Sequence, residues 1–250
     1  MIAPRFYLPP ASCLGDVLRL AGREAHHALH VLRVKCTEPV VVLDGAGHEF
    51  LCEVADASRE AVTLHVKQKN FVTPPPRQIT LLQAVPRGKI IESIIQKSVE
   101  LGAHRVVPLL TERVVMHLSE KDKTARREKW QRVAMEAIKQ CGAAWLPAIE
   151  RPVTIEQFLS RVEKFDLSLV GSLQTARRHP RECFQEFQAA FGRAPQTVAV
   201  WIGPEGDFTP DELKMIEASG ASPISLGPLT LRVETAAIYC LSVLNYELIH

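Results

Sequence analysis

The N-terminal part of the chain has the apolar spacing of β-strands. Over residues 49–55 and 61–68, apolar and polar positions alternate, which predicts half-buried strands. A glycine-containing turn signal at 44–47 precedes them, and residues 23–32 have the apolar spacing of a short helix. Residues 1–72 are therefore predicted to form a small β-rich unit.

In the rest of the chain, short apolar runs alternate with longer amphipathic segments. Residues 79–85 and 105–110 have the length and composition of strands, and residues 88–101 between them have the spacing of an amphipathic helix. A long, charged helix is predicted over residues 121–141. This alternation predicts a mostly parallel sheet covered by helices.

Two short sequences have the form of a helix start. Thr154-x-x-Gln157 and Thr209-x-x-Glu212 place a hydroxyl and a longer polar side chain three residues apart, as in a capping box. Pro210 suits the first position of a helix because its fixed φ is already helical. Both sequences therefore predict where a helix begins.

Consecutive prolines separate the two patterns. The stretch Val72-Thr73-Pro74-Pro75-Pro76-Arg77 cannot form a helix and favours an extended, semi-rigid spacer. We place the domain boundary here, which divides the chain into residues 1–72 and 73–250.

Two glycine-containing loops lie toward the C-terminal end. The first, at 201–208, follows a predicted strand at 197–202, and the second, at 225–236, leads into an apolar helix predicted over 234–249. Glycine lets a ligand approach the backbone closely, and open α/β sheets bind ligands where strands turn into helices. We predict that the loops form a binding crevice; two simple tight turns are the alternative.

Composition and charge narrow the possible functions. Hydrophobic residues make up 46% of the chain, as in globular proteins, and the formal net charge of +2 means that nucleic-acid binding must rest on local basic patches. No apolar run is long enough for a membrane span, and the first residues lack the form of a signal peptide. The six cysteines have no metal-ligand spacing, so we expect no metal and a reduced, cytoplasmic protein. The dinucleotide and P-loop glycine motifs are absent in the required context.

The predicted N-terminal unit is locally basic. Its cationic side chains include Arg5, Arg19, Arg23, Arg33 and Lys35. Contact with RNA phosphates and an ordinary solvated surface explain them equally well. His26 and His30 lie one helical turn apart and could chelate a metal, but no third ligand accompanies them.

Both glycine loops match a known signature. They carry Ile202-Gly203-Pro204-Glu205-Gly206 and Leu226-Gly227-Pro228-x-x-Leu231-Arg232-x-Glu234-Thr235-Ala236. Further matches are Gln96-Lys97-Ser98-Val99-Glu100-Leu101-Gly102, Thr111-Glu112-Arg113, Lys129-Trp130 and His27-x-x-x-Val31-Leu32-Arg33. The combination resembles the SPOUT methyltransferases, and more closely the bacterial 16S rRNA uridine-N3 methyltransferase family (ribosomal RNA small subunit methyltransferase E).

The chain departs from this family pattern at three positions. Asp207 stands where the family usually has a second glycine, and Leu229 stands where a basic residue usually follows Leu-Gly-Pro. Ala143 stands where the family commonly has an arginine. The last two departures remove charge near the expected RNA-binding face.

The resemblance implies a fold and a function. The fold is an α/β, SPOUT-type, mostly parallel sheet with a C-terminal trefoil knot, preceded by a small PUA-like β-barrel domain that binds RNA. The activity is S-adenosylmethionine-dependent methylation of uridine N3 in 16S rRNA of the small ribosomal subunit, carried out by a homodimer. The alternatives are a SPOUT methyltransferase acting on another RNA, and a catalytically weak RNA-binding factor in ribosome assembly.

The resemblance also implies site residues, with S-adenosylmethionine held mainly by backbone groups of three loops. The residues implied for cofactor binding are Val170, Gly171, Ile202, Gly203, Pro204, Glu205, Gly206, Leu226, Gly227, Leu231 and Arg232. The residues predicted to contact RNA are Arg5, Arg23, His27, Arg33, Arg87, Lys89 and Arg113.

The chemistry of uracil N3 selects the catalytic candidates. N3 carries a proton that must leave before or during methyl transfer, and negative charge then develops on the flanking carbonyl oxygens. A carboxylate can accept the proton, and an arginine can stabilise the oxygens. The predicted catalytic residues are Arg232, Glu234 and Glu205. A structural ion pair between Arg232 and Glu234 at a helix start is the alternative.

Overall fold

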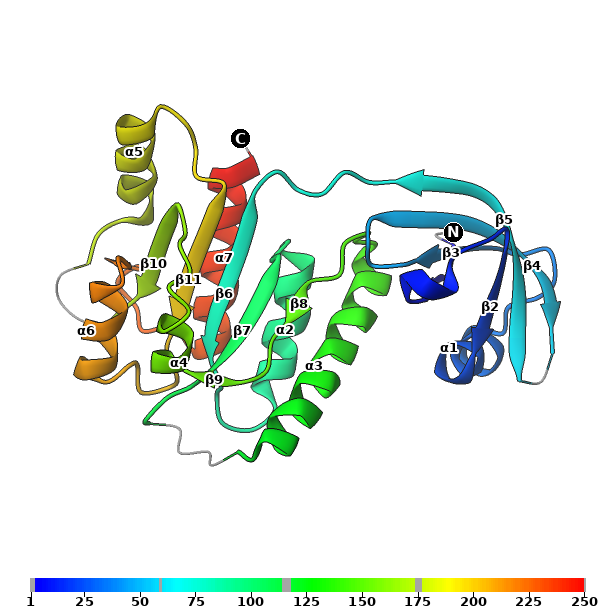
Figure 1. Ribbon diagram of the computed structural model, residues 1–250, viewed down its shortest axis with the longest axis horizontal. Coiled ribbons are helices and arrows are strands. Elements are labelled where there is room, and N and C mark those ends of the chain that lie inside the picture. Colours follow the sequence, from blue (N-terminus) through cyan, green and yellow to red (C-terminus); the bar gives the residue numbers. More distant parts are fainter. Residues whose placement is uncertain (1–2, 59, 114–117, 174–176, 250) are drawn as a thin grey trace. The chain divides into compact units, whose positions relative to one another are not determined.

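The computed structural model describes residues 3–58, 60–113, 118–173 and 177–249. The chain forms two compact units (Figure 1). The first consists of Met1–Pro74 with Met135–Leu146, and the second of Pro75–Ala134 with Pro147–His250.

The first unit is built on a five-stranded sheet in the order β1-β3-β4-β5-β2. The strands are β1 (Arg5–Tyr7), β2 (Val17–Ala21), β3 (Pro39–Leu43), β4 (His48–Ala57) and β5 (Ala61–Phe71). β1 pairs with β3 in parallel, and the other neighbours pair antiparallel, with two register shifts between β4 and β5 that help to curl the sheet. The side chains of Phe6, Leu20 and Leu64 are fully buried in its core. The predicted β-rich unit is confirmed.

The helix predicted over 23–32 is present but changes form. The α-helix α1 (Gly22–His26) runs directly into a π-helix, η2 (His27–Leu32), which ends at Arg33 in the left-handed region with φ 55°. A short 3-10 helix, η1 (Pro10–Ser12), follows β1. Ala25 and Ala28 pack in the core of the unit, which explains the apolar spacing seen in the sequence.

The division of the chain differs from the single boundary predicted at the prolines. Residues 135–146, which include the end of α3 (Glu120–Cys141), belong to the first unit. Arg5 Nη1 donates to Gln140 O at 3.1 Å, the nearly buried Lys139 Nζ pairs with Glu24 Oε1 at 2.8 Å, and Trp145 Nε1 donates to Val72 O at 2.9 Å. These partners are far apart in sequence, so the local pattern of α3 gave no sign of them.

The second unit contains a seven-stranded sheet in the order β12-β10-β11-β6-β7-β8, with β9 also pairing with β7, and every pairing is parallel. The strands are β6 (Gln78–Ala84), β7 (Arg105–Leu110), β8 (Ala148–Ile149), β9 (Val153–Thr154), β10 (Leu167–Gly171), β11 (Thr197–Ile202) and β12 (Ser222–Ile224). Nearly every residue of β6 and β11 is buried, as expected for a parallel sheet covered on both faces.

Helices supply that cover, with α2, α5 and α7 on one face of the sheet and α4 and α6 on the other (Figure 1). Their bounds are α2 (Ile90–Glu100), α4 (Ile155–Leu159), α5 (Pro180–Phe191), α6 (Pro210–Ala218) and α7 (Val233–Ile249). The capping boxes predicted at Thr154 and Thr209 are both formed. The predicted α/β class is therefore confirmed, and the trefoil knot stays a prediction from the resemblance.

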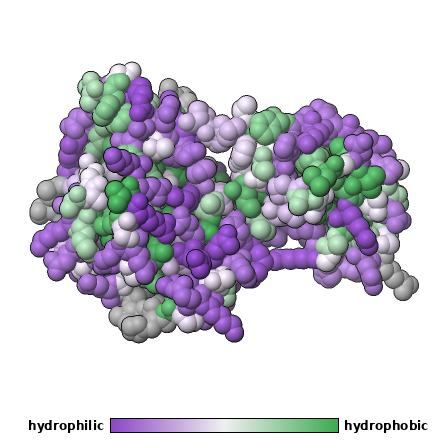
Figure 2. Space-filling view, viewed as in Figure 1, coloured by the Kyte–Doolittle hydropathy of each residue, from purple (hydrophilic) through white to green (hydrophobic). Residues whose placement is uncertain are grey.

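The surface agrees with the polar pattern of the sequence. Hydrophilic side chains cover most of the face shown in Figure 2, and hydrophobic side chains form separate patches. No helix within the described ranges is long and apolar enough to cross a bilayer.

Candidate active site

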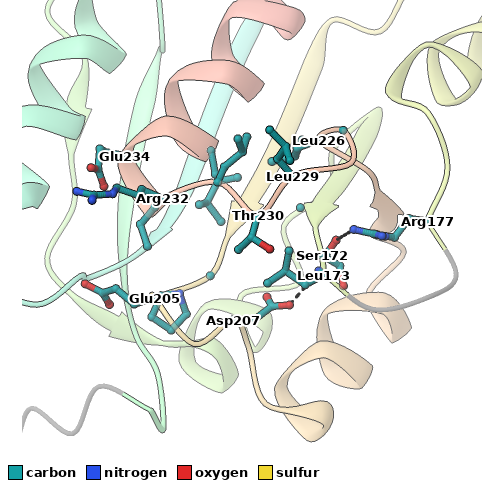
Figure 3. A pocket seen from close by; sticks show the side chains of 18 of the residues that line it. Ser172, Leu173, Arg177, Glu205, Asp207, Leu226, Leu229, Thr230, Arg232 and Glu234 are labelled. Carbon is teal, nitrogen blue, oxygen red and sulfur yellow. Dashed lines mark hydrogen bonds between the residues drawn. The ribbon is translucent and has the colours of Figure 1, made fainter.

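Three loops enclose a cavity of about 450 Å³ at the carboxyl ends of β10 and β11 (Figure 3). This is the edge at which parallel sheets bind ligands, and ligand pockets commonly measure roughly 300–1,000 Å³. The residues predicted for cofactor binding that line the cavity are Gly171, Ile202, Gly203, Pro204, Glu205, Leu226, Gly227, Leu231 and Arg232. The structure thus brings together three segments that the sequence separates.

Two of the predicted cofactor residues lie outside the cavity lining. The side chain of Val170 is fully buried in the core cluster that contains Trp201, because successive side chains of a strand point to opposite faces. Gly206 is exposed, and Arg113 covers it: a Cβ added at Gly206 would lie 3.2 Å from Arg113 Nη1. The cavity is lined instead by the neighbours of these two residues, Gly171, Glu205 and Asp207.

Glycine lets the loops pack closely at two positions. A Cβ added at Gly171 would lie 3.3 Å from Ile202 Cδ1 and 3.4 Å from Leu226 Cδ1. A Cβ added at Gly203 would lie 3.0 Å from Oδ1 and 3.2 Å from Cα of Asp207. Gly171 therefore allows the three loops to meet, and Gly203 allows its own loop to turn back on itself.

Asp207 joins two of the loops. Its backbone lies in the left-handed region with φ 64°, which aspartate tolerates better than most residues. Its Oδ2 accepts a hydrogen bond from Leu173 N at 3.0 Å, and its Oδ1 accepts one from Phe208 N at 2.8 Å (Figure 3). Asp207 therefore keeps the left-handed backbone conformation that glycine would adopt, and its side chain adds a hydrogen bond between two loops of the cavity.

The three predicted catalytic residues, Glu205, Arg232 and Glu234, all line the cavity, at the end away from Arg177 in Figure 3. Within the described part of the chain, neither Arg232 nor Glu234 forms a salt bridge, so the structure lacks the ion pair that was the alternative explanation. Glu205 Oε1 accepts a hydrogen bond from Arg87 N at 3.0 Å. Arg232 and Glu234 are therefore available to a ligand, whereas Glu205 already positions the loop after β6.

Three of the basic residues predicted to contact RNA surround this end of the cavity. Arg87 belongs to the loop that Glu205 holds, and Lys89 directly precedes Ile90, which lines the cavity. Arg113 lies over Gly206. The loop that carries Arg113 is held by a backbone hydrogen bond from Glu112 N to the buried carboxylate of Glu212, at 2.9 Å.

The other predicted RNA contacts lie in the first unit and differ in availability. Arg5 is engaged with the carbonyls of 139 and 140, and its guanidinium covers Gly142, next to the departure at Ala143. His27 is half-buried and packs edge-on against Phe6. Arg23, which approaches Glu136 at 3.6 Å, and Arg33 are exposed. The structure therefore gives Arg5 and His27 packing roles and leaves Arg23 and Arg33 at the surface.

The cavity also contains residues that were not predicted as cofactor contacts. They are Ile90, Ser172, Leu173, Arg177, Asp207, Leu229, Thr230, Val233 and Ala236. Arg177 Nη1 donates to Ser172 O at 3.3 Å and so closes the end of the cavity beside β10 (Figure 3). The only feature of the sequence that could have indicated this role is the position of Arg177 shortly after an apolar run and Gly171-Ser172.

The described residues contain no group of three or more histidine, cysteine or acidic side chains placed to hold an ion. The rings of His26 and His30 lie 4.7 Å apart, but as a pair.

Two family models match the chain. An RNA methyltransferase domain matches residues 73–245, and an RNA methyltransferase PUA domain matches residues 20–67. The first of these covers most of the chain and contains all three loops of the cavity.

Individual proteins are similar over most of their length. Ribosomal RNA small subunit methyltransferase E of Bacillus subtilis is 29% identical, over 91% of this chain and 89% of its own. The protein of that name from Synechocystis is 30% identical, over 98% of this chain and 78% of its own. A solved structure from Legionella pneumophila, described as a putative methyltransferase in complex with bound S-adenosylmethionine, is 31% identical, with a TM-score of 0.87 and coverage of 98% of both chains.

Proposed function

The chain belongs to the RNA methyltransferase family and carries that family's PUA domain, and from this premise we propose that it methylates N3 of a uridine in 16S rRNA of the small ribosomal subunit. The names of its relatives support small-subunit ribosomal RNA as the substrate. The site supports base methylation, because two arginines and three carboxylates line one cavity with an apolar wall, and Arg232 lies with Glu205 and Glu234 at one end of it. Cytoplasmic action would follow from a ribosomal substrate.

S-adenosylmethionine is the methyl donor, and the cavity suits it. The structural neighbour from Legionella pneumophila holds this cofactor. The loops here meet at Gly171 and Gly203, where side chains would fill the space, so backbone groups can contact a ligand directly. When bound, the cofactor supplies an electrophilic methyl group on its sulfonium.

Arg232 and Glu234 supply the remaining chemistry. Glu234 accepts the N3 proton, because it is a half-buried carboxylate of the site without a salt bridge among the described residues, whereas Asp207 already accepts from Leu173 N and Phe208 N. Arg232 places a permanent positive charge at the cavity and stabilises the negative charge on the uracil carbonyl oxygens. Glu205 positions the loop that carries Arg87 through its hydrogen bond to the Arg87 backbone.

The link made by Asp207 gives a first prediction. Replacing Asp207 with glycine removes the acceptor for Leu173 N and restores the residue usual in the family. A hydrogen bond to a charged group contributes about 1.5–3 kcal/mol, so we expect S-adenosylmethionine to bind roughly tenfold more weakly. Isothermal titration calorimetry measures this. Asp207→Asn, which keeps an acceptor oxygen, is the control, and equal affinity in Asp207→Gly and the native protein would contradict the role.

A homodimer is the second prediction. Helix α7 presents Tyr239 to solvent with 46% of its surface exposed, and Leu229 at the cavity edge is 75% exposed. Burial of such apolar side chains in a self-complementary interface is favourable. Light scattering is expected to give twice the 27.8 kDa chain mass at working concentration. A monomer mass would count against the dimer.

The proposed activity is tested by incubating the protein with S-adenosylmethionine and small ribosomal subunits that lack the modification. Nucleoside mass spectrometry is expected to show 3-methyluridine at one position. Methylation of a different RNA would support another target, and cofactor binding without methyl transfer would support an assembly factor.

A further inference from the structure

A second cavity, of about 410 Å³, lies in the same unit and is lined by residues of the first turns of α3, the β8–β9 segment and α4. Four cationic side chains line it: Lys123, Arg127, Arg151 and Arg161. Two carboxylates, Glu120 and Glu150, accompany them, so four positive and two negative charges leave an excess of +2. The three-loop cavity contains none of these six residues.

The wall formed by α3 is fixed to the β8 segment. Gln131 Nε2 donates to Pro147 O at 3.1 Å, and Gln131 Oε1 accepts from Ile149 N at 3.1 Å. Arg127 Nε donates to Ile149 O at 3.2 Å. Among the described residues, no acceptor pairs with the two Nη groups of Arg127. The Nε hydrogen bond therefore fixes the guanidinium at the cavity, and its Nη groups can donate to a ligand.

On the opposite wall of the cavity, two arginines pair with the carboxylate of Glu150. Glu150 Oε2 pairs with Arg161 Nη1 at 2.7 Å, and Glu150 Oε1 pairs with Arg105 Nη1 at 3.3 Å. Arg161 also stacks over the Phe158 ring, with its Cζ 5.2 Å from the centroid. Because both oxygens of Glu150 face guanidinium groups, this carboxylate opposes an incoming anion only weakly.

The second carboxylate of the cavity, Glu120, faces two cationic side chains. Glu120 lies 2.8 Å from Lys123 Nζ and 3.9 Å from Arg151 Nη1, and its side chain is 74% exposed. The Lys123 side chain is only 13% exposed, so its charge is held at the floor of the cavity. The cavity therefore offers fixed N–H donors and positive charge, which suit a phosphate group.

We propose that this cavity binds a phosphodiester of the RNA backbone at a distance from the methylated base, an inference that rests on RNA being the substrate. β9 pairs with Leu109 and Leu110, at the carboxyl end of β7. The chain continues from there to Arg113, which covers Gly206 in the loop after β11. The cavity runs from the start of β7, where Ala148 and Ile149 pair, to its carboxyl end, where Val153 pairs, and so reaches the edge of the sheet that holds the active site. This placement favours a continuous nucleic-acid strand over a free phosphate ion.

Matched charge reversals test the proposal. Arg151→Glu changes the cavity, and Lys214→Glu makes the same change of charge outside it; the two side chains are 58% and 77% exposed, and each approaches one exposed carboxylate. Binding of a fluorescent oligouridine is measured from low to moderate salt. Arg151→Glu is expected to weaken binding roughly tenfold and to lower the salt slope by about one, whereas Lys214→Glu is expected to leave the slope unchanged.

Further measurements separate the outcomes. Lys123→Gln is the second cavity variant and is expected to act in the same direction, with unchanged thermal unfolding in all three variants. Equal slopes in Arg151→Glu and Lys214→Glu would overturn the proposal. So would calorimetric binding of inorganic phosphate that Arg151→Glu abolishes while oligouridine binding is unaffected, because the cavity would then serve a free anion. If the native protein fails to methylate 16S rRNA but Arg151→Glu still weakens oligouridine binding, the proposed function fails and the cavity assignment stands.

Discussion

Arg232→Ala is expected to slow methyl transfer by roughly 10²–10³-fold, the usual effect of removing one group that stabilises developing negative charge. Arg232 is exposed, lines the three-loop cavity and has no salt bridge among the described residues. Its removal therefore leaves the backbone contacts of the cofactor loops in place. Single-turnover kinetics measure the rate, and calorimetry is expected to show S-adenosylmethionine affinity within about threefold of the native value.

Variants of the two nearby carboxylates, Glu234 and Glu205, serve as controls for the role of Arg232. Glu234→Gln removes the proposed proton acceptor, so its rate is expected to recover as pH rises and uracil N3 loses its proton without help. Glu205→Gln keeps an oxygen that can accept a hydrogen bond from Arg87 N, so it is expected to slow methyl transfer much less than Arg232→Ala does. An unchanged single-turnover rate in Arg232→Ala, with cofactor and RNA saturating, would show that Arg232 has no part in the chemistry.

Gly203→Ala is expected to reduce S-adenosylmethionine affinity by roughly tenfold or more, with about fivefold as the smallest effect. The added Cβ would lie 3.0 Å from Asp207 Oδ1, 3.1 Å from Phe208 N and 3.2 Å from Asp207 Cα. Two of these three atoms belong to the backbone, so a side-chain rotation cannot relieve the contact and the loop must shift. Overpacking of this kind costs about 1–3 kcal/mol, which corresponds to a change in affinity of roughly 5- to 150-fold if the loop opens.

Gly15→Ala is the matched control for Gly203→Ala. A Cβ added at Gly15 meets nothing within 4 Å, so the same chemical change is expected to alter neither cofactor affinity nor the unfolding temperature. Cofactor affinity of Gly203→Ala equal to that of Gly15→Ala would show that the loop tolerates a side chain and that its glycine is not required for the cavity.

Local patterns in the sequence determined most of the secondary structure. The apolar runs and amphipathic spacing placed β6, β7, α2 and α7 within two residues of their bounds. The capping boxes at Thr154 and Thr209 were predictable because their hydrogen bonds join residues three apart. The two glycine loops were recognised for the same reason, since strand, turn and helix follow one another directly.

Weaker elements escaped prediction. β8 and β12 are two and three residues long, too short for a period to show, and they are defined by parallel neighbours from distant parts of the chain. The π-helical end of α1 was also missed, because its sequence has ordinary helical spacing.

Which residues share a site depends on the folded structure. The strands, the helix starts and the glycine loops could be predicted from the sequence alone, because they depend on neighbours along the chain. The sequence could not show that Val170 faces the core while Gly171 faces the cavity, or that Asp207 accepts from Leu173, or that the end of α3 packs with the first unit. Those facts depend on side-chain direction and on hydrogen bonds between distant segments, which form only when the chain is folded.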